Sequence, residues 1–95
     1  MNLNRESIYK KAIAFNGEFM QKVVAIEELS ELQKELTKDL RDSENRKHIV
    51  EEMSDVTIML EQLKLIYKVS QNELDEEIDY KLVRLMHRIN NELEE

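Results

Sequence analysis

The chain has 95 residues, of which 37% are charged and 41% hydrophobic, with one glycine and no proline, cysteine or tryptophan. This length predicts a single domain, residues 1–95, and the near absence of helix breakers predicts an all-α fold. A net charge of −7 argues against a nucleic-acid duplex as partner. The missing cysteines exclude disulfides and thiolate metal sites, and no apolar run could span a bilayer, so we expect a cytoplasmic protein with no membrane contact.

The first half of the chain predicts two helices. The first is expected over residues 4–15 and the second over residues 18–40. Between them lies Asn16-Gly17, the one strong breaker pair, where we expect a bend or short turn. The alternative is a glycine tolerated inside one continuous helix.

The second half predicts two more helices, which completes an antiparallel four-helix bundle-like arrangement. The third helix is expected over residues 44–69, with Asp42 or Ser43 as its N-cap. The fourth is expected over residues 71–92. Its start is marked by a capping box, in which the Ser70 side chain caps the helix and the Glu73 side chain reaches back to the backbone N–H of Ser70.

Placing residues at about 100° intervals assigns each helix an apolar face. On the second helix this face consists of Ala25, Ile26, Leu29, Leu32, Leu36 and Leu40. On the third it consists of Ile49, Met53, Val56, Leu60, Leu63 and Tyr67, widened by Met59 and Ile66. On the fourth it consists of Leu74, Ile78, Leu82, Leu85, Ile89 and Leu93. Glu52 falls inside the widened arc of the third helix, where a carboxylate needs a partner, a proton or a metal.

Two pairs of acids follow the same spacing on successive helices. Glu28 and Glu31 share one helix face, and Glu52 and Asp55 repeat the pattern on the next helix. Adjacent antiparallel helices can bring the pairs together, and such a cluster is stable only with a cation or with bound protons. All-oxygen ligands favour Mg²⁺, Mn²⁺ or Ca²⁺ over zinc. The alternative is that Lys or Arg from another helix pairs with Glu52.

The sequences Glu-Glu-Leu-Ser-Glu at 27–31 and Glu-Glu-Met-Ser-Asp at 51–55 resemble the ExxE…ExxD signature of MazG-like nucleoside triphosphate pyrophosphohydrolases. These all-α enzymes form a group with the dimeric dUTPases. The likeness covers roughly residues 15–88 and includes Phe15-Asn16-Gly17 and Gln21 before the first motif. These upstream residues resemble the approach to the first motif in small phage-type members of the group.

This resemblance implies a MazG-like fold and a Mg²⁺-dependent enzyme, with Mn²⁺ as a second fitting metal. It implies that Glu28, Glu31, Glu52 and Asp55 bind the metal and catalyse cleavage of an NTP or dNTP to the monophosphate and pyrophosphate. It also implies a homodimer or homotetramer. Ile58 and Leu65 support an oligomer, because they point away from the main stripe of the third helix.

Further polar residues are candidates for binding the substrate. Glu27 or one of the two acids of the first pair could orient or deprotonate the attacking water, and spacing does not choose among them. Lys81, Arg84 and Arg88 share a flank of the fourth helix and could bind phosphate oxygens, with ion pairing to surface acids as the alternative. Gln21 is the last candidate.

Other functions fit the same composition. One is a non-catalytic helical-bundle interaction module, and another is a MazG-like domain that has lost activity and senses nucleotides. The position of Glu52 within an apolar face argues against the interaction module. A di-iron carboxylate bundle is disfavoured because it needs Glu-x-x-His pairs, whereas the fourth positions here are Glu31 and Asp55.

Overall fold

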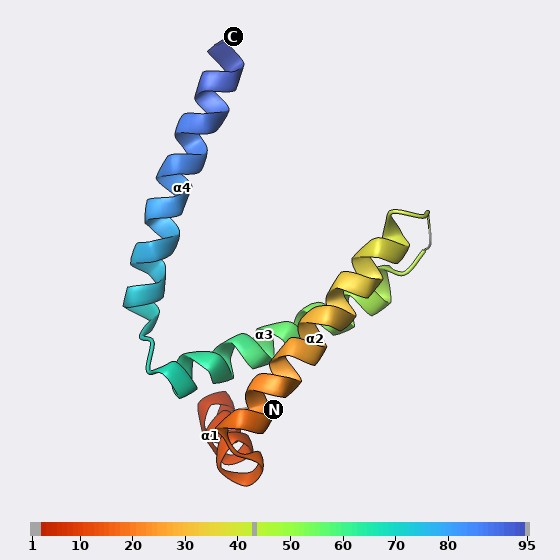
Figure 1. The fold of residues 1–95 in the computed structure, drawn as a ribbon, viewed down its shortest axis with the longest axis vertical. Coiled ribbons are helices and arrows are strands. Elements are labelled where there is room, and N and C mark those ends of the chain that lie inside the picture. The colour runs from red at the N-terminus through yellow and green to blue at the C-terminus, as the bar shows by residue number, and fades with distance from the viewer. Residues whose placement is uncertain (1–2, 43, 95) are drawn as a thin grey trace.

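The computed structural model describes the backbone of residues 3–42 and 44–94 and contains four helices in that part of the chain (Figure 1). These are α1 (Arg5–Asn16), α2 (Glu18–Asp39), α3 (Arg46–Tyr67) and α4 (Gln71–Glu94). The all-α class and the four predicted helices are confirmed, and no helix end differs from its predicted position by more than two residues. No described helix has the length and hydropathy of a transmembrane segment.

The turn between α1 and α2 is made by a single residue. Gly17 has a φ of +89° and a ψ of 153°, a conformation that side chains with a Cβ rarely adopt. Its backbone N–H donates to the carbonyl of Ile13 at 2.8 Å, so α1 ends there and α2 starts in a new direction. The predicted bend at Asn16-Gly17 is therefore confirmed.

The helices α2 and α3 form an antiparallel pair, and α1 packs against one end of both (Figure 1). The buried apolar side chains at the centre are Ala25 from α2 and Val56 and Met59 from α3. This small core is extended by two buried amides, Gln21 and Gln62, which hydrogen-bond to each other at 2.7 Å.

The face of α2 that packs coincides only in part with the leucine face that periodicity favoured. Its buried residues are Gln21, Ala25 and Glu35. Most of the predicted face is exposed, namely Ile26, Leu29, Leu36 and Leu40. Ala25 of the predicted face is buried, so the packed face overlaps the predicted one but is rotated towards the side that bears Gln21, Glu28 and Glu35.

The packed face of α3 is also rotated from the prediction. Val56, Met59 and Gln62 are buried, whereas Met53, Leu60 and Tyr67 of the predicted stripe are exposed. The rotation towards Met59 carries the side of the helix that bears Glu52 into the contact with α2.

The loop between α2 and α3 is held by an asparagine that replaces the expected N-cap. Asn45 directly precedes α3 and donates from Nδ2 to the backbone carbonyl and to Oε2 of Glu35, both at 2.8 Å. Asp42 has a φ of +63° within the turn, so it does not cap α3. Ser43, the other predicted N-cap, lies outside the described residues. The Asn45 hydrogen bond and Lys38 hold the pKa of Glu35 below its usual value.

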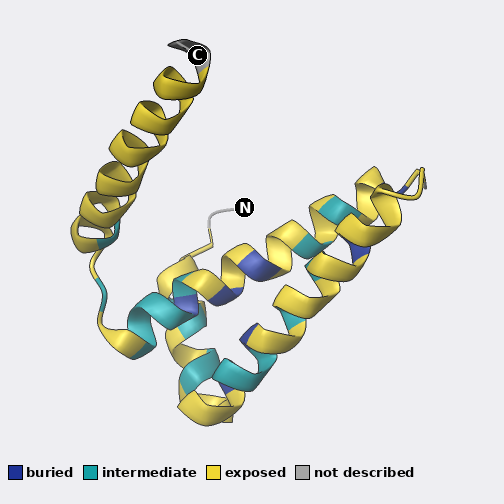
Figure 2. Ribbon diagram, turned by 45° about the horizontal axis from the view of Figure 1, so that its top comes forward, coloured by how far each residue is buried: buried dark blue, intermediate teal, exposed yellow. Residues whose placement is uncertain are grey.

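The last helix, α4, begins as predicted but lies apart from the other three. Ser70 Oγ accepts a hydrogen bond from the backbone N–H of Glu73 at 3.1 Å, which confirms the cap. Beyond this start α4 extends away from α1–α3, and among the described residues it has no packing contact with them (Figures 1 and 2). Ile78, Leu82, Leu85 and Ile89 are therefore exposed, not core, in a single chain, and the side chain of Leu93 lies outside the described residues.

Candidate metal centre

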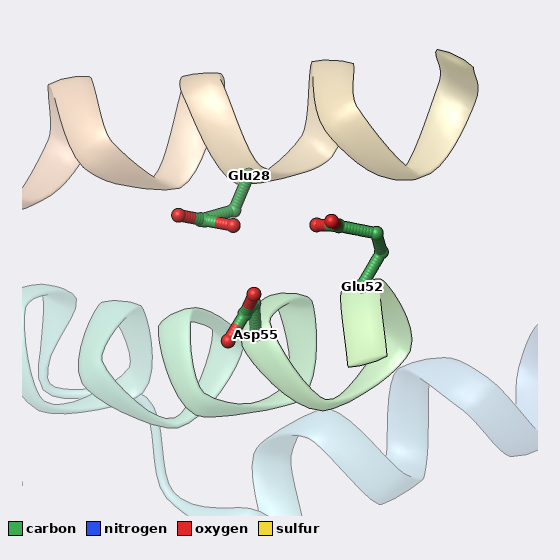
Figure 3. Close-up of side chains that lie close together, drawn as sticks. All are labelled: Glu28, Glu52 and Asp55. Carbon is green, nitrogen blue, oxygen red and sulfur yellow. The ribbon is translucent and has the colours of Figure 1, made fainter. Parts of the chain in front are cut away.

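Three of the four predicted metal ligands converge between α2 and α3. Glu28 points from α2 towards Glu52 and Asp55 on α3 (Figure 3). One carboxylate oxygen from each of the three lies within 4.8 Å of the others. The two sequence motifs, separated by the α2–α3 loop, thus supply one group of acids.

The antiparallel packing of α2 and α3 explains this convergence. Glu28 follows the buried Ala25 by about one turn of α2, and Glu52 precedes the buried Val56 by about one turn of α3. The acids therefore lie along the edge of the small core. Glu28 and Glu52 are half-buried and Asp55 is exposed, so the cluster is open to solvent on one side.

The ionised forms of Glu28 and Glu52 are disfavoured by burial and by neighbouring acids. Partial burial raises the pKa of Glu28, and the nearby charges of Asp55 and Glu52 raise it further. Burial also raises the pKa of Glu52, followed by the charges of Asp55 and Glu31. Among the described residues, no Lys or Arg forms an ion pair with Glu28, Glu52 or Asp55. The structure therefore gives no support to a structural ion pair for Glu52.

The donor set suits a hard divalent cation. All three groups are carboxylates, and two oxygens bound to the same Mg²⁺ lie at most about 4.2 Å apart. The observed limit of 4.8 Å lies about 0.6 Å above that spacing. His48, the nearest alternative ligand in the sequence, lies instead beside Glu51 at 3.6 Å and is exposed. The chemistry of the cluster thus fits Mg²⁺ or Mn²⁺ and does not favour zinc.

The other two acids of the first motif lie outside the group of three. Glu31 is exposed, yet its charge contributes to the raised pKa of both Glu28 and Glu52, so it faces the cluster from one turn further along α2. Glu27 is also exposed, and its charge is not among those that raise the pKa of Glu28 or of Glu52.

Gln21 is placed in the interior of the chain. It is 4% exposed, accepts at Oε1 from Asn16 Nδ2 at 2.9 Å and donates from Nε2 to Gln62 Oε1 at 2.7 Å. The chain Asn16–Gln21–Gln62 therefore links the end of α1 with α2 and α3. Sequence reasoning did not single out Gln62, although it follows Asp55 by seven residues and so lies on the same face of α3.

The three basic candidates gather on α4 but not at the acids. Lys81, Arg84 and Arg88 line one shallow surface hollow together with Leu85, as their spacing predicted. Arg84 also lies over the ring of Tyr80, 5.9 Å from its centroid. Among the described residues α4 meets α3 at its start, where Lys64 Nζ donates to Gln71 Oε1, and the rest of α4 extends away, so one chain does not bring this flank to its own acidic cluster.

The raised pKa values predict a pH-dependent stability difference between the metal-free protein and its Glu52→Gln variant. A carboxyl whose pKa is raised in the fold contributes stability that is present below its unfolded pKa and lost as the pH rises through the folded value. In EDTA, the variant should therefore melt above the wild type at pH 7, and the two should converge below about pH 4.5. Thermal melts across this range measure the difference, and a gap that is independent of pH would contradict the electrostatic cause.

Comparison of the chain with protein-family models, curated proteins and solved structures finds no match. The resemblance to MazG-like enzymes therefore rests on the two acidic motifs and their order along the chain. The structure adds that Glu28, Glu52 and Asp55, which come from both motifs, lie together.

Proposed function

We propose that the protein is a Mg²⁺-dependent pyrophosphohydrolase of the MazG-like type. It would convert an NTP or dNTP to the monophosphate and pyrophosphate in the cytoplasmic nucleotide pool. The observation that carries this proposal is the convergence of Glu28, Glu52 and Asp55 from two helices. A solvent-open group of carboxylates, in which burial and neighbouring acids raise the pKa values of Glu28 and Glu52, and which has no basic partner in the described chain, is suited to a cation.

In this mechanism the carboxylates hold the metal. A triphosphate carries three to four negative charges, so an acidic cluster needs a cation before it can receive one. The metal would supply charge neutralisation at the leaving pyrophosphate and activation of the attacking water. Glu28, Glu52 and Asp55 would hold it.

A further carboxylate would serve the attacking water. Glu31 lies close enough for its charge to act on Glu28 and Glu52, and it is exposed to the solvent from which the water comes. In the proposed reaction Glu31 accepts the proton of the attacking water, with Glu27, about one turn earlier on α2, as the alternative base. The active species is a homodimer or homotetramer.

The test is the identity of the product. Purified protein with Mg²⁺ and a panel of NTPs and dNTPs should release pyrophosphate and the monophosphate, which ion-exchange chromatography separates from the diphosphate and orthophosphate. EDTA should remove the activity, and added Mg²⁺ should restore it. Orthophosphate as the first product would refute the pyrophosphohydrolase assignment.

A non-catalytic interaction module is the second candidate, and the exposed apolar side chains favour it. Leu29 and Leu36 of α2 and the stripe of α4 offer surfaces for other helices. Such a module would bind neither Mg²⁺ nor nucleotides. Titration calorimetry with Mg²⁺ distinguishes the two functions, because heat of binding that Glu52→Gln removes supports the enzyme.

A further inference from the structure

The helix α4 carries an apolar stripe that one chain leaves uncovered. Ile78, Leu82, Leu85 and Ile89 are 43%, 49%, 39% and 46% exposed, respectively, and share one face of a 24-residue helix. Most helices in proteins owe their stability to packing of such a face, since isolated helices in water are only marginally stable. The stripe thus indicates a partner for α4.

The charges of α4 are segregated along its length. Residues 71–80 contain five acids and no Lys or Arg, namely Glu73, Asp75, Glu76, Glu77 and Asp79. Residues 81–90 contain Lys81, Arg84 and Arg88 and no acid. Two parallel copies of this helix would therefore place like charges side by side, whereas two antiparallel copies would place opposite charges side by side.

The apolar stripe has a matching symmetry. Leu74 and Ile89 are equally far from the point between Lys81 and Leu82, and Ile78 and Leu85 are equally far from the same point. A two-fold axis through this point would place Leu74 opposite Ile89 and Ile78 opposite Leu85. A closed two-fold interface requires a self-complementary surface of this kind, and a helix of an unrelated protein does not.

We propose that α4 is a homodimerisation helix that pairs antiparallel with the α4 of a second copy of this chain. Glu73 and Glu77 lie on the same flank as Arg84 and Arg88, at helical spacings of four and seven residues. In the antiparallel pair this flank faces its own copy, so the two acids of one helix lie beside the two arginines of the other. The inference assigns these arginines to pairing and does not rest on the pyrophosphohydrolase activity.

Charge exchange on this flank tests the proposal. Wild type should have twice its chain mass of 11.4 kDa in light scattering at high micromolar concentration. Glu73→Lys/Glu77→Lys and Arg84→Glu/Arg88→Glu should each lose the dimer, because each flank then carries a single sign of charge. A mixture of the two variants should recover it as a heterodimer, and the chain with all four substitutions should recover it alone.

The control variant reverses the same number of charges at positions outside the flank that bears Glu73, Glu77, Arg84 and Arg88. Glu44→Lys/Glu76→Lys alters two exposed acids, one before α3 and one on the far side of α4, and should keep the dimer. The proposal would be overturned if the wild type were a monomer. It would also be overturned if either double variant stayed a dimer by itself, or if the mixture of the two double variants stayed monomeric. A monomer that still releases pyrophosphate would overturn the pairing and leave the enzyme assignment intact.

Engineered disulfides test the orientation, because the chain has no cysteine of its own. Position 82 lies next to the proposed two-fold axis. The variant Leu82→Cys should therefore form a disulfide between the two copies of the chain under mild oxidation. Leu74→Cys alone should not crosslink, whereas Leu74→Cys mixed with Ile89→Cys should. Crosslinking of Leu74→Cys to itself would show a parallel pair and refute the antiparallel arrangement.

Discussion

Glu52→Gln is expected to lower pyrophosphate release by about 100-fold or more while the chain stays folded. The substitution keeps the size of the side chain but removes one of the three charges that would hold the cation. It also removes one of the neighbouring charges that, together with burial and Asp55, raise the pKa of Glu28, so the metal-free variant should be at least as stable as the wild type. Initial rates at saturating Mg²⁺, with thermal melts in EDTA, measure the two effects.

The matched control for this variant is the neighbouring acid. Glu51→Gln makes the same change one residue earlier on α3, where the carboxylate is exposed beside His48 at 3.6 Å and outside the cluster. It should keep the activity within a few-fold of wild type. Equal activity in wild type and Glu52→Gln would make Glu52 a structural residue and would remove the basis of the proposed function.

Gln62→Leu is expected to destabilise the fold by about 1–3 kcal/mol, although it replaces a polar residue with an apolar one in the core. Gln62 Oε1 accepts the hydrogen bond of Gln21 Nε2 at 2.7 Å, and both side chains are 4% exposed. The leucine leaves this N–H buried without an acceptor. Urea unfolding followed by circular dichroism gives the free energy of unfolding.

A double substitution separates the lost hydrogen bond from the change in packing. Gln21→Leu/Gln62→Leu removes both buried polar partners, so it should recover most of the stability that the single change loses. Gln33→Leu, on the exposed side of α2, is the control and should lie within about 0.5 kcal/mol of wild type. If Gln62→Leu alone is as stable as wild type, the Gln21–Gln62 bond does not stabilise the fold.

The local features of this protein follow from its sequence. Helix-forming composition, the Gly17 breaker and the Ser70 cap act within a few residues, so the four helices and their ends could be predicted. The three-residue spacing within each acidic pair is also local. It places Glu28 and Glu52 on helix faces that can meet when the two helices pack antiparallel. For the same reason the acidic cluster could be anticipated from two motifs.

The tertiary structure alone decided which faces meet. Periodicity identifies an apolar face but does not fix which part of it packs, and the contact with α3 buried Ala25 together with Gln21 and Glu35 while leaving Leu29 and Leu36 exposed. Burial of Gln62 became apparent only with its partner Gln21, because a buried amide is stable only when another chain segment satisfies it. The separation of α4 from the other helices was equally non-local, since an amphipathic stripe predicts that a helix is covered but not by which surface.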